Sequence, residues 1–161
     1  MTQKKIILEQ MAACHNKKNW FVPVSDAVSG LRAEQAVWNA GTENHSVMQI
    51  VNHLIFWNGR WLVRFKGGIP EKMEGENSAT FTGDKNTWEE ALDKLDKILS
   101  LWEEVLKKAG ETKLQGEAFK GFGDNWYSVL TQITIHNAYH IGQIVTIRKQ
   151  QGSWNNEAGV K

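Results

Sequence analysis

Apolar residues recur three and four positions apart in four long stretches of the chain, which is the spacing of one helix face. The stretches cover about residues 3–15, 46–66, 87–110 and 124–151. In the third, the side opposite the apolar stripe carries Asp, Lys and Glu, as in an amphipathic helix packed on one side. The last is apolar around much of its circumference, which is typical of a central helix or of one shared with a second subunit. We therefore expect four long helices.

Capping and turn residues set the ends of these helices. Ser46 with Gln49, and Thr87 with Glu90, each form the capping-box pattern of a helix start. Pro23 opens a short helical or irregular segment, and polar, glycine-containing connections cover residues 67–86 and 111–124. No segment shows the alternation expected of a strand. The pattern predicts an all-α fold, a four-helix bundle with long crossover connections, as a single domain over residues 1–161.

Composition narrows the class of protein. The chain has 161 residues, of which 41% are apolar and 23% charged, and its formal net charge is +1. Such a balanced charge gives no basic face for nucleic acid. No apolar run reaches the roughly 18 residues of a membrane span, and no signal-peptide pattern opens the chain. A single cysteine, Cys14, excludes an internal disulfide, and we interpret it as a small core residue. We expect a cytoplasmic protein that binds neither nucleic acid nor membrane.

Two histidines lie one helical turn apart in the last predicted helix. His136 and His140 are four residues apart, so their side chains share a face and can reach the same ion. Buried imidazoles need bonded nitrogens, which a shared metal would supply. A pair of core histidines satisfied by hydrogen bonds or water explains this spacing equally well. The pair by itself leaves both interpretations open.

His53 favours the metal. It lies on the predicted second helix, three residues after Ile50 and four before Trp57, and so leans toward the core. Three imidazoles with open coordination positions are typical of catalytic metal sites. Imidazole suits zinc, nickel, iron or copper. His45 and His15 are assigned to an exposed helix-flanking position and to a helix end, outside the site.

Other metal-site motifs are missing from the sequence. Asn137 follows His136, so there is no H-E-x-x-H, and Glu-x-x-His does not occur either. A zinc metalloprotease and a ferritin-like di-iron site are therefore not expected.

Two segments resemble the DinB/YfiT-like family. Residues 45–57, HSVMQIVNHLIFW, are similar to its second-helix motif, and residues 136–144, HNAYHIGQI, to its H-x-x-x-H-x-G-Q-[IV] signature. The resemblance covers nearly the whole chain. It implies a four-helix bundle, commonly a homodimer, with a metal held by His53, His136 and His140. Some relatives attach a low-molecular-weight thiol such as bacillithiol or mycothiol to a small electrophile, and others isomerise substrates with such a thiol.

The resemblance makes a thiol-dependent S-transferase our first functional hypothesis. It would use one divalent ion (zinc, nickel or iron), a thiol such as bacillithiol as co-substrate, and a small electrophile as substrate. Alternatives are a metal-dependent hydrolase and a non-catalytic, stress-induced metal-binding dimer. No general base is identifiable. Further residues expected to support the histidines or to contact substrate are Gln143, Asn137, Trp57 and Trp61, with Trp20 as a candidate pocket wall.

Overall fold

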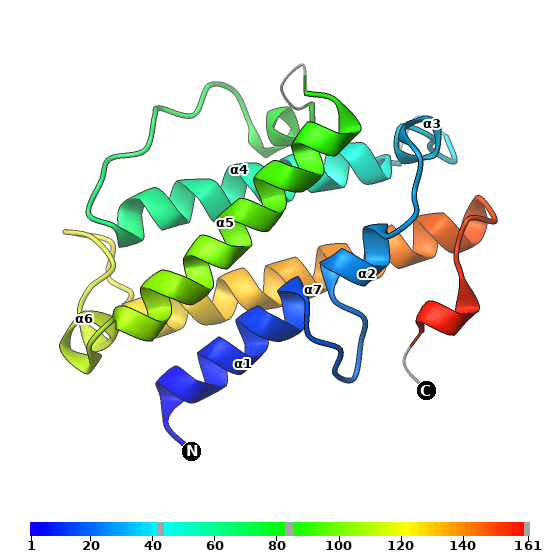
Figure 1. Ribbon diagram of the computed structural model, residues 1–161. Helices are drawn as coiled ribbons and strands as arrows, with labels where there is room; N and C mark the ends of the chain where they lie inside the picture. Colours follow the sequence, from blue (N-terminus) through cyan, green and yellow to red (C-terminus); the bar gives the residue numbers. More distant parts are fainter. Residues whose placement is uncertain (42–43, 83–85, 160–161) are drawn as a thin grey trace.

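The computed structural model describes residues 1–41, 44–82 and 86–159. Four long helices dominate it (Figure 1): α1 (Gln3–His15), α4 (Val47–Phe65), α5 (Trp88–Lys108) and α7 (Trp126–Gln150). The described residues form no β-strand beyond one isolated bridge. The predicted all-α fold is confirmed. The shorter helices are α2 (Val24–Val28), α3 (Ala33–Ala36), α6 (Glu111–Gln115), and the 3₁₀ turns η1 (Asn77–Phe81) and η2 (Asn156–Ala158).

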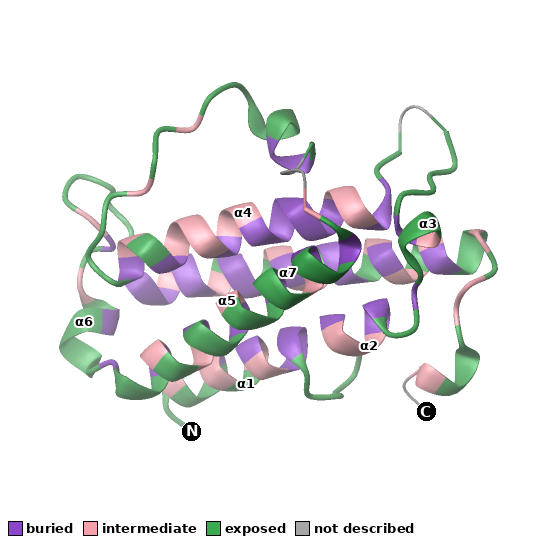
Figure 2. Cartoon of the chain, turned by 45° about the horizontal axis from the view of Figure 1, so that its top comes forward, coloured by how far each residue is buried: buried purple, intermediate pink, exposed green. Residues whose placement is uncertain are grey.

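The long helices pack with their apolar faces inward. Helix α4 lies against both α5 and α7, and α1 lies against α5 and α7. Figure 2 shows buried residues on the facing sides of these helices and exposed residues on the outer side of α5. No helix among the described residues combines the length and the apolar character that a bilayer crossing requires.

The helices begin where local sequence chemistry places them. The side chains of Ser46 and Thr87 accept hydrogen bonds from the backbone N–H of Gln49 and Glu90, and both capping boxes are complete. Asn125 caps α7 by accepting from the backbone N–H of Ser128 at 2.9 Å. The sequence predicts a plain connection over residues 111–124, but the structure places the five-residue helix α6 there, which is too short to show a helical period.

A buried amide pair joins α4 to α7 near the middle of the bundle. Asn58 Nδ2 donates to Asn137 Oδ1 at 2.8 Å, and Asn137 Nδ2 donates back to Asn58 Oδ1 at 3.0 Å. Asn58 Nδ2 also donates to the carbonyl oxygen of Leu54. Because both amides are almost fully buried, each needs the other as a partner. The pair sets the register of the two helices that carry the candidate site.

Candidate metal centre

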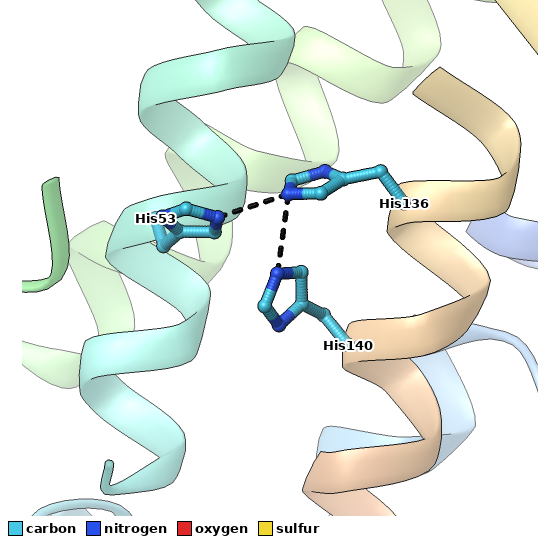
Figure 3. A group of neighbouring side chains, drawn as sticks. All are labelled: His53, His136 and His140. Atoms are coloured by element: carbon cyan, nitrogen blue, oxygen red, sulfur yellow. Dashed lines mark hydrogen bonds between the residues drawn. The ribbon is translucent and has the colours of Figure 1, made fainter. Parts of the chain in front are cut away.

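The structure brings together three histidines from two facing helices. His53 projects from α4, and His136 and His140 project from successive turns of α7 (Figure 3). His136 Nε2 lies 2.9 Å from His53 Nε2 and 3.1 Å from His140 Nε2. One ligand atom from each residue lies within 4.8 Å of the other two. His53 and His140 are buried, and His136 is half-buried.

The surroundings of His53 determine which ring nitrogen carries its proton. Its Nδ1 lies 2.6 Å from Thr80 Oγ1, and that hydroxyl donates its own hydrogen to the carbonyl oxygen of Asn77 at 2.6 Å. The hydroxyl oxygen can therefore accept, and Nδ1–H donates to it. This leaves the lone pair of His53 on Nε2, facing the other two histidines.

His140 is held in the same tautomer by Gln143. Its Nδ1 lies 2.6 Å from Gln143 Oε1. Gln143 Nε2 donates to the hydroxyl of Tyr139 at 3.0 Å, which orients the amide so that its oxygen faces the imidazole. An amide oxygen can only accept, so Nδ1 of His140 carries the proton and Nε2 carries the lone pair. Outer partners of this kind commonly orient metal-binding histidines.

The hydrogen count at the centre of the site favours a cation. Nε2 of His53 and Nε2 of His140 both present lone pairs to His136 Nε2, which carries at most one hydrogen when neutral. One hydrogen cannot satisfy two acceptors at full strength. A metal ion would bind all three lone pairs at once.

Both protonation and spacing fit such an ion. Burial, with the adjacent imidazoles of His140 and His136, lowers the pKa of His53 to about 3. Burial and His140 lower the pKa of His136 to about 4, and burial also lowers the pKa of His140. The rings are therefore neutral at neutral pH, the form that ligates metal. Nitrogens about 2.0–2.1 Å from a tetrahedral zinc are roughly 3.3 Å apart, close to the 2.9 and 3.1 Å that separate His136 Nε2 from the other two.

An aromatic stack backs the site. Phe81, at the end of η1, lies between two imidazoles: its ring centroid is 4.0 Å from that of His53 and 3.7 Å from that of His45. Both contacts are nearly parallel. Thr80 and Phe81 therefore fix the His53 ring from two directions, by a hydrogen bond and by stacking.

A cavity of about 390 Å³ opens beside His136. Trp57 and Trp61 of α4 and Phe122 of the loop before α7 supply its aromatic walls. Trp57 is anchored by its indole N–H, which donates to Asn77 Oδ1 at 3.1 Å. The remaining lining residues are Asn58, Asn77, Asp124, Val129, Gln132 and Ile133. Of the three histidines, His136 is the one that lines this cavity, so a ligand would approach along its side.

Comparison with protein families decides the assignment. A family model described as the DinB superfamily matches residues 24–144, which include all three histidines. This chain belongs to the DinB superfamily. Comparison with curated proteins and with solved structures found no match.

The other candidate site residues differ in whether they contact the histidines or line the cavity. Gln143 bonds His140, and Trp57 and Trp61 line the cavity. Asn137 pairs with Asn58 instead of facing the cavity. Trp20 is 94% exposed and does not line the cavity, so its suggested role as a pocket wall was wrong: the segment after α1 turns its indole to the surface.

Two histidines left outside the site have other surroundings. His45 is exposed, as expected, but stacks on Phe81. His15 is buried, and its Nε2 lies 2.8 Å from Asp96 Oδ1. Its hydrogen-bond partner is therefore a side chain of α5 and not the end of its own helix.

Sequence reasoning missed Thr80 and Phe81. They lie in the long connection between α4 and α5, where no periodic pattern marks them. The length of that connection was the one available signal, since long loops in compact domains are often functional.

Proposed function

We propose that this protein is a metal-dependent transferase that joins a low-molecular-weight thiol to a small electrophile. The observation that carries the proposal is the cluster of three neutral histidines with one member, His136, open to an aromatic-walled cavity. Such a cluster leaves coordination positions for a substrate. Membership of the DinB superfamily supports it, because the resembling relatives described above include thiol transferases.

The ion would be zinc, nickel or iron. It would be held by His53, His136 and His140. A divalent ion there would lower the pKa of a bound thiol and keep it as the nucleophilic thiolate. Thr80 and Gln143 hold the protons on the outer ring nitrogens, which keeps the inner lone pairs available. The aromatic walls exclude water from the electrophile and orient it beside His136.

The test uses monochlorobimane and purified, zinc-loaded protein. Conjugation forms a carbon–sulfur bond as the carbon–chlorine bond breaks, the thiol proton passes to solvent and chloride leaves. Bacillithiol, mycothiol, cysteine and glutathione are offered separately. We expect fluorescence to rise above the uncatalysed rate with at least one thiol, and the rate to disappear in His136→Ala.

Controls separate the alternatives. His15→Ala, which removes a histidine of α1 that contacts Asp96 and not the group of three, should retain metal content and rate. The variant with His53, His136 and His140 all changed to Ala should lose both. Equal metal content in the triple variant would overturn the metal site. Ester hydrolysis without any thiol would replace the transferase by a hydrolase, and no turnover with any thiol would overturn catalysis of this kind.

We also propose that the chain forms a homodimer through the outer face of α7. Ile135 and Tyr139 on that helix are 59% and 63% exposed. Ile135 also lines, with Ile6 and Phe21, an apolar groove of about 310 Å³ between α1 and α7. Light scattering should give twice the mass of the chain, and Ile135→Glu should give the single mass. A wild-type protein that stays monomeric at the highest attainable concentration would overturn this proposal.

A further inference from the structure

The cavity beside His136 has an uneven distribution of charge. Among the described residues that line it, Asp124 is acidic and none is Lys or Arg. Asp124 is exposed, and its carboxylate makes no hydrogen bond or ion pair with another described residue. Its carbonyl oxygen accepts from Ala118 N–H at 2.9 Å. The lining of the cavity therefore includes one acidic residue whose carboxylate pairs with no described residue.

Asp124 and His136 both line this cavity, but they lie far apart along the chain direction of α7. Val129, Gln132, Ile133 and His136 line it from one face of α7. From Trp126 to His136 the helix rises about 15 Å, at roughly 1.5 Å per residue, and Asp124 precedes Trp126. That separation exceeds the screening length of about 8–10 Å at physiological ionic strength. An ion held by the histidines would therefore interact only weakly with the Asp124 carboxylate.

Aromatic rings line the same cavity as Asp124. Phe122 lies two residues before Asp124, and its ring centroid is 5.6 Å from that of Trp61. The Arg64 guanidinium carbon lies 5.3 Å from the centroid of Trp61 and 4.3 Å from that of Phe119, so rings of this cluster can take part in cation–π contacts. Indole and phenyl faces attract cations, most strongly when these are weakly hydrated.

The helix start offers no anion site that would compete. Asn125 caps α7 through its own side chain, so the backbone N–H of Ser128 is satisfied. Asp124 places negative charge beside the same positive helix end. An anionic group arriving there would meet the carboxylate before it could use the helix dipole.

We infer that this cavity selects substrates whose end distant from the metal carries a cationic group, such as an ammonium, held between Trp61, Phe122 and Asp124. This inference rests on the proposed function and names the charge class of its substrate. It excludes elongated substrates with a carboxylate or phosphate at that end.

Binding of three small probes of matched shape tests the inference. The cationic probe is choline. The neutral probe is 3,3-dimethylbutan-1-ol (tert-butylethanol), in which carbon replaces the nitrogen, and the anionic probe is 3,3-dimethylbutanoate (tert-butylacetate). The indole N–H NMR signals of Trp57 and Trp61, assigned with Trp→Phe variants, report binding to zinc-loaded protein. Cation–π attraction and a partly exposed ion pair together should make choline bind about tenfold more tightly than tert-butylethanol. In metal-free protein, where no ion can bind its carboxylate, tert-butylacetate should bind weakest.

Variants locate the effect. Asp124→Asn should reduce the preference for choline to about twofold, the share left to the rings, and Asp124→Glu should retain most of it. Asp93→Asn, on the exposed face of α5, removes the same charge elsewhere and should leave the preference unchanged. Equal or tighter binding of tert-butylethanol in the wild type, or an unchanged preference in Asp124→Asn, would overturn the inference.

The two proposals fail separately in this design. Repeating the titration on metal-free protein isolates the cavity from the ion. A choline preference without thiol transfer would refute the transferase and keep the charge assignment. Thiol transfer without a choline preference would keep the transferase and refute the charge assignment.

Discussion

Replacing Thr80 by valine should weaken metal binding without unfolding the protein. Thr80 is 6% exposed and its hydroxyl accepts from Nδ1–H of His53 at 2.6 Å. Valine has nearly the same shape but cannot accept. In the metal-free variant, His53 can move its proton to Nε2 and donate to His136, which lies 2.9 Å away. Binding a metal must then reverse that shift and bury an Nδ1–H without a partner.

The size of the effect follows from the loss of that partner. Removing the outer partner of a metal-bound histidine usually reduces affinity by about 10–100-fold. At about 1.4 kcal/mol per tenfold change, this equals roughly 1.4–2.8 kcal/mol. The cost of a buried donor without an acceptor, about 1–3 kcal/mol, covers the same range. We therefore expect the zinc dissociation constant of Thr80→Val to rise by one to two orders of magnitude.

The assay is competition for zinc with a chromophoric chelator, with thermal unfolding followed on the same samples. Thr80→Ser keeps the hydroxyl and should bind zinc nearly as the wild type does. Thr82→Val is the matched control, because Thr82 lies in the same segment, is exposed, and donates to the Ala79 carbonyl oxygen instead of facing a histidine. Equal zinc affinity in Thr80→Val and Thr82→Val would refute the reasoning about the His53 tautomer.

Three further predictions concern stability and reactivity. Asn137→Ala leaves the buried amide of Asn58 without its main partner, so the free energy of unfolding measured in urea should fall by about 2–4 kcal/mol. A fall of less than about 0.5 kcal/mol, as for a substitution at an exposed position, would contradict the pairing. In metal-free protein the pKa of His53 is about 3 and that of His136 about 4, whereas the unfolded chain titrates near 6.5. As the pH is lowered, the unfolded state therefore binds protons first. The free energy of unfolding should fall from about pH 6.5 to about pH 4, by at most about 1.4 kcal/mol per pH unit for each histidine. The fall should be shallower in His136→Gln, and an equal slope would argue against burial of His136 as a neutral ring. Burial raises the pKa of Cys14 to about 12, so a disulfide reagent at mildly alkaline pH should modify the unfolded protein and spare the native one; rapid modification of native protein would show that this part of the core opens.

The sequence by itself determined the features that depend on neighbours along the chain. The capping pairs at Ser46 and Thr87 gave the starts of α4 and α5, because capping is completed within one helical turn. The four-residue spacing of His136 and His140 placed both rings on one face of α7, since that relation follows from helix geometry alone. His53 was inferred from its leaning toward the core and from the family resemblance, because its distance from the pair depends on how α4 meets α7.

The tertiary structure decided everything that depends on the meeting of distant segments. It brought Thr80 to the outer nitrogen of His53 and placed Phe81 against its ring, although no local pattern marks either residue. It paired Asn137 with Asn58, a role that spacing along α7 could not distinguish from a place in the cavity. The protonation of the three histidines follows from this arrangement, because burial and the contact of imidazoles from two helices lower their pKa values.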